Sequence, residues 1–167
     1  MRSAYLLLAL LLLSVPAVGQ PDRVPAQQKG YFQPEFVADG EGNLGMLWTR
    51  PVAGGHDLFL ARRQANGALV DPVRVNSDPG DVLYLPHREG RPGIASGPGG
   101  RVGVSWFDRS GQLHVAISQD QGRSFGPAIA VAPGHARPEH AFSDVAFDAN
   151  GTLYVTWIDV SAAPQGQ

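Results

Sequence analysis

The stretch Ser118–Phe125 reads Ser-Gln-Asp-Gln-Gly-Arg-Ser-Phe and is preceded by alternating apolar residues and followed by a second apolar run. Asp120 can accept hydrogen bonds from backbone N–H groups further along the chain, and Gly122 can adopt a positive φ without steric cost. Ser118 can add a second local hydrogen bond, and the ring of Phe125 can cover the turn. The stretch therefore predicts a β-hairpin with a side-chain-bonded turn.

Upstream and downstream of this turn, the chain repeats itself. Its three tryptophans align the segments 34–48, 92–106 and 143–157 without gaps, each with a short apolar run, a glycine and an alternating run that ends in tryptophan. The second half of the unit repeats as well, because residues 58–67 align with residues 113–122. Each complete unit therefore holds four short strands, which predicts an all-β fold.

The pattern Ser-x-Asp-x-Gly-x-x-Phe at residues 118–125, set in this repeat, resembles the Asp-box (BNR repeat) of sialidase-like, exo-alpha-sialidase-like β-propellers. The resemblance covers Pro34–Val160 and implies a partial β-propeller of about two and a half four-stranded antiparallel blades. The implied blades are residues 34–76, 92–131 and, in part, 143–160, followed by a tail at 161–167.

The number of blades is the main departure from that family, because propellers close with roughly four to eight blades. We expect a truncated gene product. Self-association of several chains to complete the propeller and a marginal open stack of sheets are the alternatives.

The first 19 residues have the features of a cleaved signal peptide: a positive Arg2, the apolar run Tyr5–Leu13, and small residues at Ala17 and Gly19. Cleavage is predicted before Gln20, which implies secretion to an extracellular or periplasmic location. The apolar run is shorter than the roughly 20 residues of a membrane-spanning helix, so no membrane association is expected after cleavage. Residues 20–33 form a polar, extended leader.

Composition narrows the classes of function. The chain has no cysteine, 21 glycines and 14 prolines, and a formal net charge of −2. These values exclude disulfides and thiolate metal sites, and they give no basic surface for nucleic acid.

The resemblance implies that ligands bind at the end of the propeller away from the Asp-box, whose residues Ser118, Asp120, Gly122 and Phe125 are then structural. Sialidases of this type clamp a carboxylate with three arginines, and they use a tyrosine nucleophile with a glutamate and an aspartic acid. Candidate ligand-binding residues in the loops at that end are His87, Arg88, Arg91, Arg137, Glu139 and His140. No complete catalytic set can be assigned, so catalytic residues stay unknown.

Other polar and aromatic residues receive structural interpretations. The histidine spacing matches no metal-ligand motif, so neither a metal nor another cofactor is predicted. Asp39 and Asp148 precede Gly turns and predict turn hydrogen bonds rather than calcium ligation. Tyr154 is expected to pack on the strand face opposite Trp157. Packing between sheets, rather than stacking on a sugar, is expected for Phe32, Phe107 and Phe142.

Together these observations predict a secreted, sialidase-like module that binds a carbohydrate or an extracellular protein, or serves a structural role, without catalysis. The alternatives are an exo-sialidase-like glycoside hydrolase and an inactive truncated fragment of one. Whether the chain is an enzyme stays open at this point, with the balance toward a protein that is not one.

Overall fold

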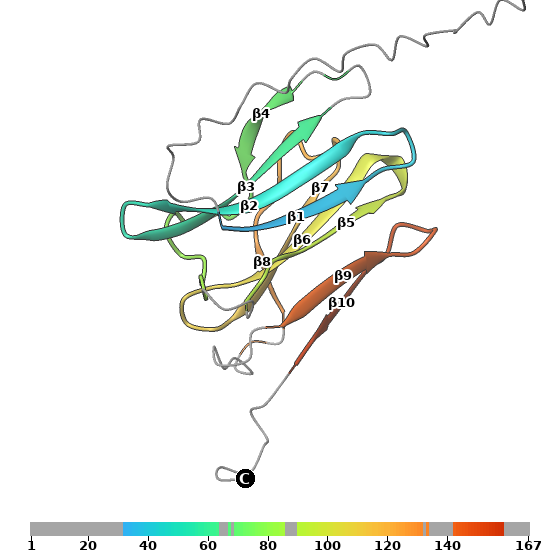
Figure 1. Ribbon diagram of the computed structural model, residues 1–167. Helices are drawn as coiled ribbons and strands as arrows, with labels where there is room; N and C mark the ends of the chain where they lie inside the picture. Colours follow the sequence, from blue (N-terminus) through green and yellow to red (C-terminus); the bar gives the residue numbers. More distant parts are fainter. Residues whose placement is uncertain are drawn as a thin grey trace, which may run out of the picture.

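The structure is a computed structural model that describes residues 32–63, 67, 69–85, 90–131, 133 and 142–158. These residues form three antiparallel sheets with almost no helix, as Figure 1 shows. The first sheet contains, in sequence order, β1 (Phe32–Ala38), β2 (Leu44–Val52), β3 (Gly55–Arg63) and β4 (Leu69–Arg74). The predicted all-β class is confirmed, and β1 begins two residues before the predicted start of the first repeat at Pro34.

The second sheet repeats the four-stranded order of the first. It contains β5 (Gly93–Gly97), β6 (Arg101–Phe107), β7 (Leu113–Ser118) and β8 (Ile129–Val131), with the short helix η1 (Pro98–Gly100) between β5 and β6. The third sheet pairs β9 (Ser143–Phe147) with β10 (Leu153–Trp157). The hairpin predicted around Ser118–Phe125 is thus the antiparallel pair of β7 and β8.

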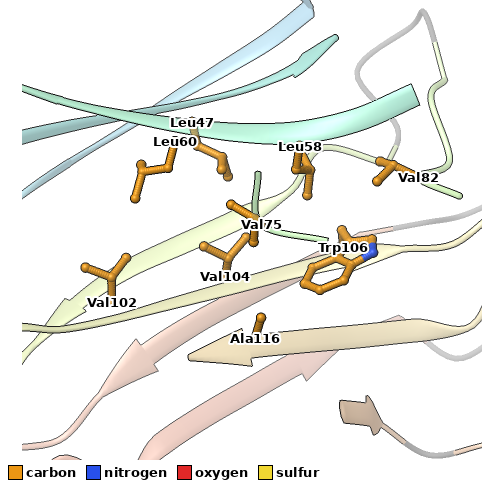
Figure 2. Close-up of a cluster of buried hydrophobic side chains, with 9 residues drawn as sticks. All are labelled: Leu47, Leu58, Leu60, Val75, Val82, Val102, Val104, Trp106 and Ala116. Carbon is orange, nitrogen blue, oxygen red and sulfur yellow. The ribbon is translucent and has the colours of Figure 1, made fainter. Parts of the chain in front are cut away.

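The core lies between the first two sheets (Figure 2). In β6, Val102, Val104 and Trp106 alternate along the strand and point to the first sheet, as period-2 geometry requires. Their buried partners on both sides of this interface are Leu47, Leu58, Leu60, Val75, Val82 and Ala116. Complete burial of each large side chain contributes about 1.5–3 kcal/mol, so this interface is the main source of stability.

The other face of the second sheet carries small residues, and the third sheet packs against it. A Cβ atom added at Gly103 would lie 2.7 Å from Leu153 Cδ1, so the two sheets can approach this closely only with glycine there. Ser105 Oγ and Ser143 Oγ lie 3.0 Å apart across the same interface. The alternation of large and small residues along β6 therefore determines which sheet packs against each face of the second sheet.

The first strands of the three sheets lie next to one another, because β5 contacts both β1 and β9. Their order in space follows their order in sequence, and Figure 1 shows the sheets stacked in succession. Within the part of the chain that the structure describes, no helix is long and apolar enough to span a bilayer.

Candidate functional site

The turn at Ser118–Phe125 is bonded as the sequence predicts. Ser118 Oγ donates to Asp120 Oδ1 at 2.6 Å, and Ser124 donates to the same carboxylate through its N–H at 2.9 Å and its Oγ at 2.6 Å. Gly122 has φ of 77° and its N–H donates to Ser118 Oγ at 2.7 Å. Burial alone would raise the pKa of Asp120, but the hydrogen bonds from Ser118 and Ser124 outweigh it and lower that pKa far below its ordinary value.

The same turn also contacts the rest of the molecule. Phe125 is partly buried and packs against the core between the first two sheets, in keeping with its predicted covering role. Gln121 has a positive φ of 62°, and its N–H donates to the carbonyl of Gly100 at 2.7 Å. This bond ties the β7–β8 turn to the β5–β6 turn and places both at one end of the second sheet. Gln121 was missed from the sequence, because a positive φ is uncommon outside glycine.

Asp39 and Asp148 hold the β1–β2 and β9–β10 turns, as predicted. In each case Oδ1 accepts the backbone N–H groups two and four residues further on, at 2.8–2.9 Å. Burial would raise the pKa of Asp39, yet hydrogen bonds from Asn43 and Glu41 lower it. The N–H of Thr152 lowers the pKa of Asp148. We call the end of the sheets that carries these turns and the Ser118–Phe125 turn the turn end.

A partly buried carboxylate–imidazole pair was not foreseen from the sequence. Asp108 Oδ2 lies 2.8 Å from His114 Nε2, while Asp108 Oδ1 accepts the N–H groups of Ser110 and Gln112 at 2.8 and 2.9 Å. Burial raises the pKa of Asp108, but hydrogen bonds from Ser110 and His114 lower it overall. The imidazole stacks on Trp106, with ring centroids 5.7 Å apart. Asp108 therefore holds the β6–β7 turn in place and is engaged within the protein.

A hollow of about 590 Å³ lies at the opposite end of the inner strands, where β5 and β9 begin and β10 ends. We call it the central hollow. Its charged lining comes from Glu35, Arg91 and Asp144, and half of its apolar side chains are aromatic. The aromatic members are Phe36, Phe142 and Trp157, which are 60%, 44% and 37% exposed.

Arg91 is the one candidate binding residue from the sequence that falls among the described residues. Its Nη1 lies 2.8 Å from Glu35 Oε1, so the segment just before β5 reaches across to β1. The two side chains are 58% and 27% exposed, which leaves the pair open to the hollow. Glu35 was not foreseen as its partner, because Glu35 lies in the first sheet and Arg91 comes just before the second. The other candidates, His87, Arg88, Arg137, Glu139 and His140, lie outside the described residues.

Two aromatic expectations were wrong and one is confirmed. Tyr154 lies on the strand face opposite Trp157 but is 57% exposed, because no described element packs on that face. Phe142 is exposed in the central hollow rather than packed between sheets. Phe107, by contrast, is 4% exposed and packs with Leu113, as expected. The side chain of Phe32 is not among those described.

The catalytic constellation of a sialidase is not assembled around the central hollow by the described residues. The described tyrosines are Tyr84 and Tyr154, and neither lines the hollow. Tyr84 lies instead against His56, with ring centroids 4.9 Å apart. Within the described ranges, no group of three or more acidic or histidine side chains could hold a metal ion.

Comparison with known proteins finds a likeness to solved structures. No known family model matches the chain, and no curated protein does. Among solved structures, the Hadza microbial sialidase Hz136 is similar, with a TM-score of 0.51 and 18% sequence identity. The likeness covers 78% of this chain and 33% of the sialidase, so the chain spans about a third of that protein's length. The fold is therefore sialidase-like and fits a β-propeller, whereas activity does not follow from fold alone.

Proposed function

We propose that the chain is a secreted, sialidase-like β-propeller module that binds a carbohydrate in the central hollow without cleaving it. The observation that carries this proposal is the Arg91–Glu35 ion pair, 2.8 Å long, beside the exposed rings of Phe142 and Trp157 in one hollow. Exposed aromatic faces stack on the apolar faces of sugar rings, and charged side chains bind hydroxyl groups strongly.

The chemistry of the lining favours binding over hydrolysis. The positive charge of Arg91 is already paired with the carboxylate of Glu35, so its guanidinium is less available to bind a substrate carboxylate. The remaining acid, Asp144, accepts a hydrogen bond from the N–H of Val145 at 2.8 Å. A glycosidase needs either two carboxyl groups facing the scissile bond or a nucleophilic tyrosine. Of the two carboxyl groups in the hollow, that of Glu35 is paired with Arg91, and the described tyrosines lie elsewhere.

An array of neutral, sialylated and uronate-bearing glycans tests this proposal with the full chain. We expect retention of at least one glycan, lost in Trp157→Ala and weakened in Arg91→Ala, with no release of sugar. A matched control is Ile129→Ala, because Ile129 is 57% exposed and lies outside the hollow lining. Failure of every glycan to bind would contradict the carbohydrate ligand and leave an extracellular protein as the partner to be tested.

The rival function is an exo-sialidase-like glycoside hydrolase, which the likeness to a sialidase structure favours. Turnover of a fluorogenic sialoside by the purified chain, abolished by Arg91→Ala, would establish this rival. No turnover by folded protein would agree with a binding module or an inactive fragment.

The finer structural assignments belong to the same proposal. The two four-stranded sheets and the two-stranded sheet correspond to two blades and part of a third, and the Ser118–Phe125 turn to an Asp-box of the sialidase-like family. If several chains complete the propeller, light scattering of the purified chain should find a defined oligomer, whereas a stable monomer would exclude this assembly.

Mass spectrometry of the exported protein should find Gln20 at its N-terminus.

A further inference from the structure

A second hollow, of about 660 Å³, lies away from the central hollow and shares no lining residue with it. We call it the rim hollow. It is lined by residues of β2, β3 and β4, by the segment that follows β4, and by Phe125 and the two residues after it. Its charged residues are Arg50, Asp57 and Arg74, so two cations and one anion face it. Neither the resemblance nor the proposed function assigns a role to this hollow.

Arg50 is held in place by an aromatic ring. Its guanidinium carbon lies 3.8 Å from the centroid of the Phe59 ring, and Phe59 is itself buried and stacked near Trp48. A guanidinium over a ring face is attracted to the ring and keeps its N–H edge free for other partners. No acidic side chain among the described residues lies within ion-pair distance of Arg50.

Arg74 approaches the same place from β4. The strand register puts it opposite Phe59, while Arg50 stands opposite Asp57 on the other side of β3. Arg74 Nη1 is 3.9 Å from Asp57 Oδ2, which is a long ion pair, and the Arg74 side chain is 42% exposed. Its donors are therefore largely free to meet a ligand from solvent.

The single anion of the rim hollow is engaged inside the protein. Asp57 is 3% exposed, and its Oδ1 accepts Asn76 Nδ2 at 2.8 Å and the N–H of Gly80 at 2.7 Å. Asn76 is buried too and accepts the N–H of Leu58 at 2.8 Å. This network fixes the floor of the hollow and leaves it with a net positive charge.

We propose that the rim hollow binds a carboxylate carried by an acidic saccharide, with Arg50 and Arg74 as its ligands. The planar fork of each guanidinium matches the two oxygens of a carboxylate. Ser77 Oγ accepts the N–H of Ala128 at 3.1 Å, so its own hydroxyl hydrogen is directed to other acceptors, such as a sugar hydroxyl. Phe125 and Pro127 supply an apolar wall against which the sugar ring packs.

Sodium glucuronate is the probe, titrated into the full chain and followed through the arginine side-chain NMR signals, with glucose as the uncharged control. We expect glucuronate, and not glucose, to shift the signals of Arg50 and Arg74. The double variant Arg50→Gln/Arg74→Gln should bind about tenfold more weakly or worse, since each lost charged hydrogen bond weakens binding strongly. Added NaCl should weaken the binding of the wild-type chain.

Three further variants make the test decisive. Arg63→Gln removes the same charge from β3 outside the rim hollow and should bind normally. If the double variant fails to fold, as circular dichroism would show, Arg74→Gln alone takes its place, because the guanidinium held over the Phe59 ring is that of Arg50. Undiminished binding in a folded variant, or equal binding of glucose, overturns the proposal. Loss of glucuronate binding in Arg91→Gln alone would also overturn it, because the carboxylate would then occupy the central hollow.

Discussion

At the turn end, the carboxylates of Asp39 and Asp120 are bound by groups no more than four residues away in the chain, whereas in the central hollow Arg91 meets Glu35 from another sheet. The turn carboxylates have their hydrogen-bonding capacity filled by their own loops. The central ion pair stays open to solvent and lies beside exposed aromatic rings. The difference indicates that one end maintains the fold and the other is available to a ligand.

Hydrogen bonds within one loop explain why the Ser118–Phe125 stretch indicates the fold of the chain rather than its activity. Ser118 and Asp120 satisfy backbone donors that the turn would otherwise leave unpaired, and such donors are costly when buried. The central hollow has no comparable sequence pattern, because it forms only when strands from three sheets come together.

At the turn end, substitution of Gly122 is expected to lower the stability most. In Gly122→Ala the new Cβ would lie 2.5 Å from Leu60 Cδ2, at a φ of +77° that side chains rarely adopt. Strain and overpacking together should lower the free energy of unfolding by about 2–4 kcal/mol, measured by urea denaturation. Gly42→Ala is the control, because φ is +83° there but no atom lies within 4 Å of the new Cβ. An equal loss in both variants would show that packing against Leu60 contributes nothing.

The next largest effect is expected for Asp120→Ala, which removes the acceptor of three hydrogen bonds from Ser118 and Ser124. We expect a loss of about 1–2 kcal/mol in the free energy of unfolding. Gln119→Ala provides the comparison, since Gln119 is exposed next to the same turn. A stability equal to that of Gln119→Ala would mean that the carboxylate does not hold the turn.

The pH dependence of stability should report the same turns. Because hydrogen bonds lower the pKa of Asp39 and Asp120 in the folded chain, folding stabilises their charged forms. This stability is fully present above the ordinary aspartate pKa of about 3.9 and is lost as pH falls through the lower folded values. Thermal midpoints measured between neutral and acidic pH should therefore decline below about pH 4. Asp120→Asn should flatten that decline, and a curve parallel to wild type would contradict the assignment.

The smallest effect on stability is expected in the central hollow. Phe36 is 60% exposed there, so Phe36→Ala should change the free energy of unfolding by about 0.5 kcal/mol or less. Binding of a glycan found on the array should nevertheless fall, because the ring lines the hollow. Ile129→Ala, at 57% exposure outside the lining, should change neither quantity appreciably. Glycan binding that survives Phe36→Ala intact would place the ligand elsewhere.

The sequence predicted what depends on neighbours in the chain. The hairpins follow from apolar alternation, and the bonds of Ser118, Asp120 and Gly122 follow from turn chemistry. Alternation also anticipated the core face of β6, with Val104 completely buried.

What the sequence could not predict depends on how strands pair within a sheet and on contacts between sheets. Arg91 pairs with Glu35, and Asp108 pairs with His114. Predicting either pair requires knowing how the strands pair and pack. Tyr154 was expected to be packed because alternation places it on the strand face opposite Trp157, and that face is exposed among the described residues. Such errors arise because alternation shows which side of a strand a residue occupies, and not what covers that side.

The most direct test of the division between the two ends compares Asp120→Ala with Arg91→Ala for both stability and glycan binding. The account predicts that Asp120→Ala lowers the free energy of unfolding while the folded protein binds the glycan with wild-type affinity. It predicts the reverse for Arg91→Ala, which should unfold like wild type and bind more weakly. Loss of binding in Asp120→Ala without loss of stability would contradict the account, because the turn would then be part of the binding site.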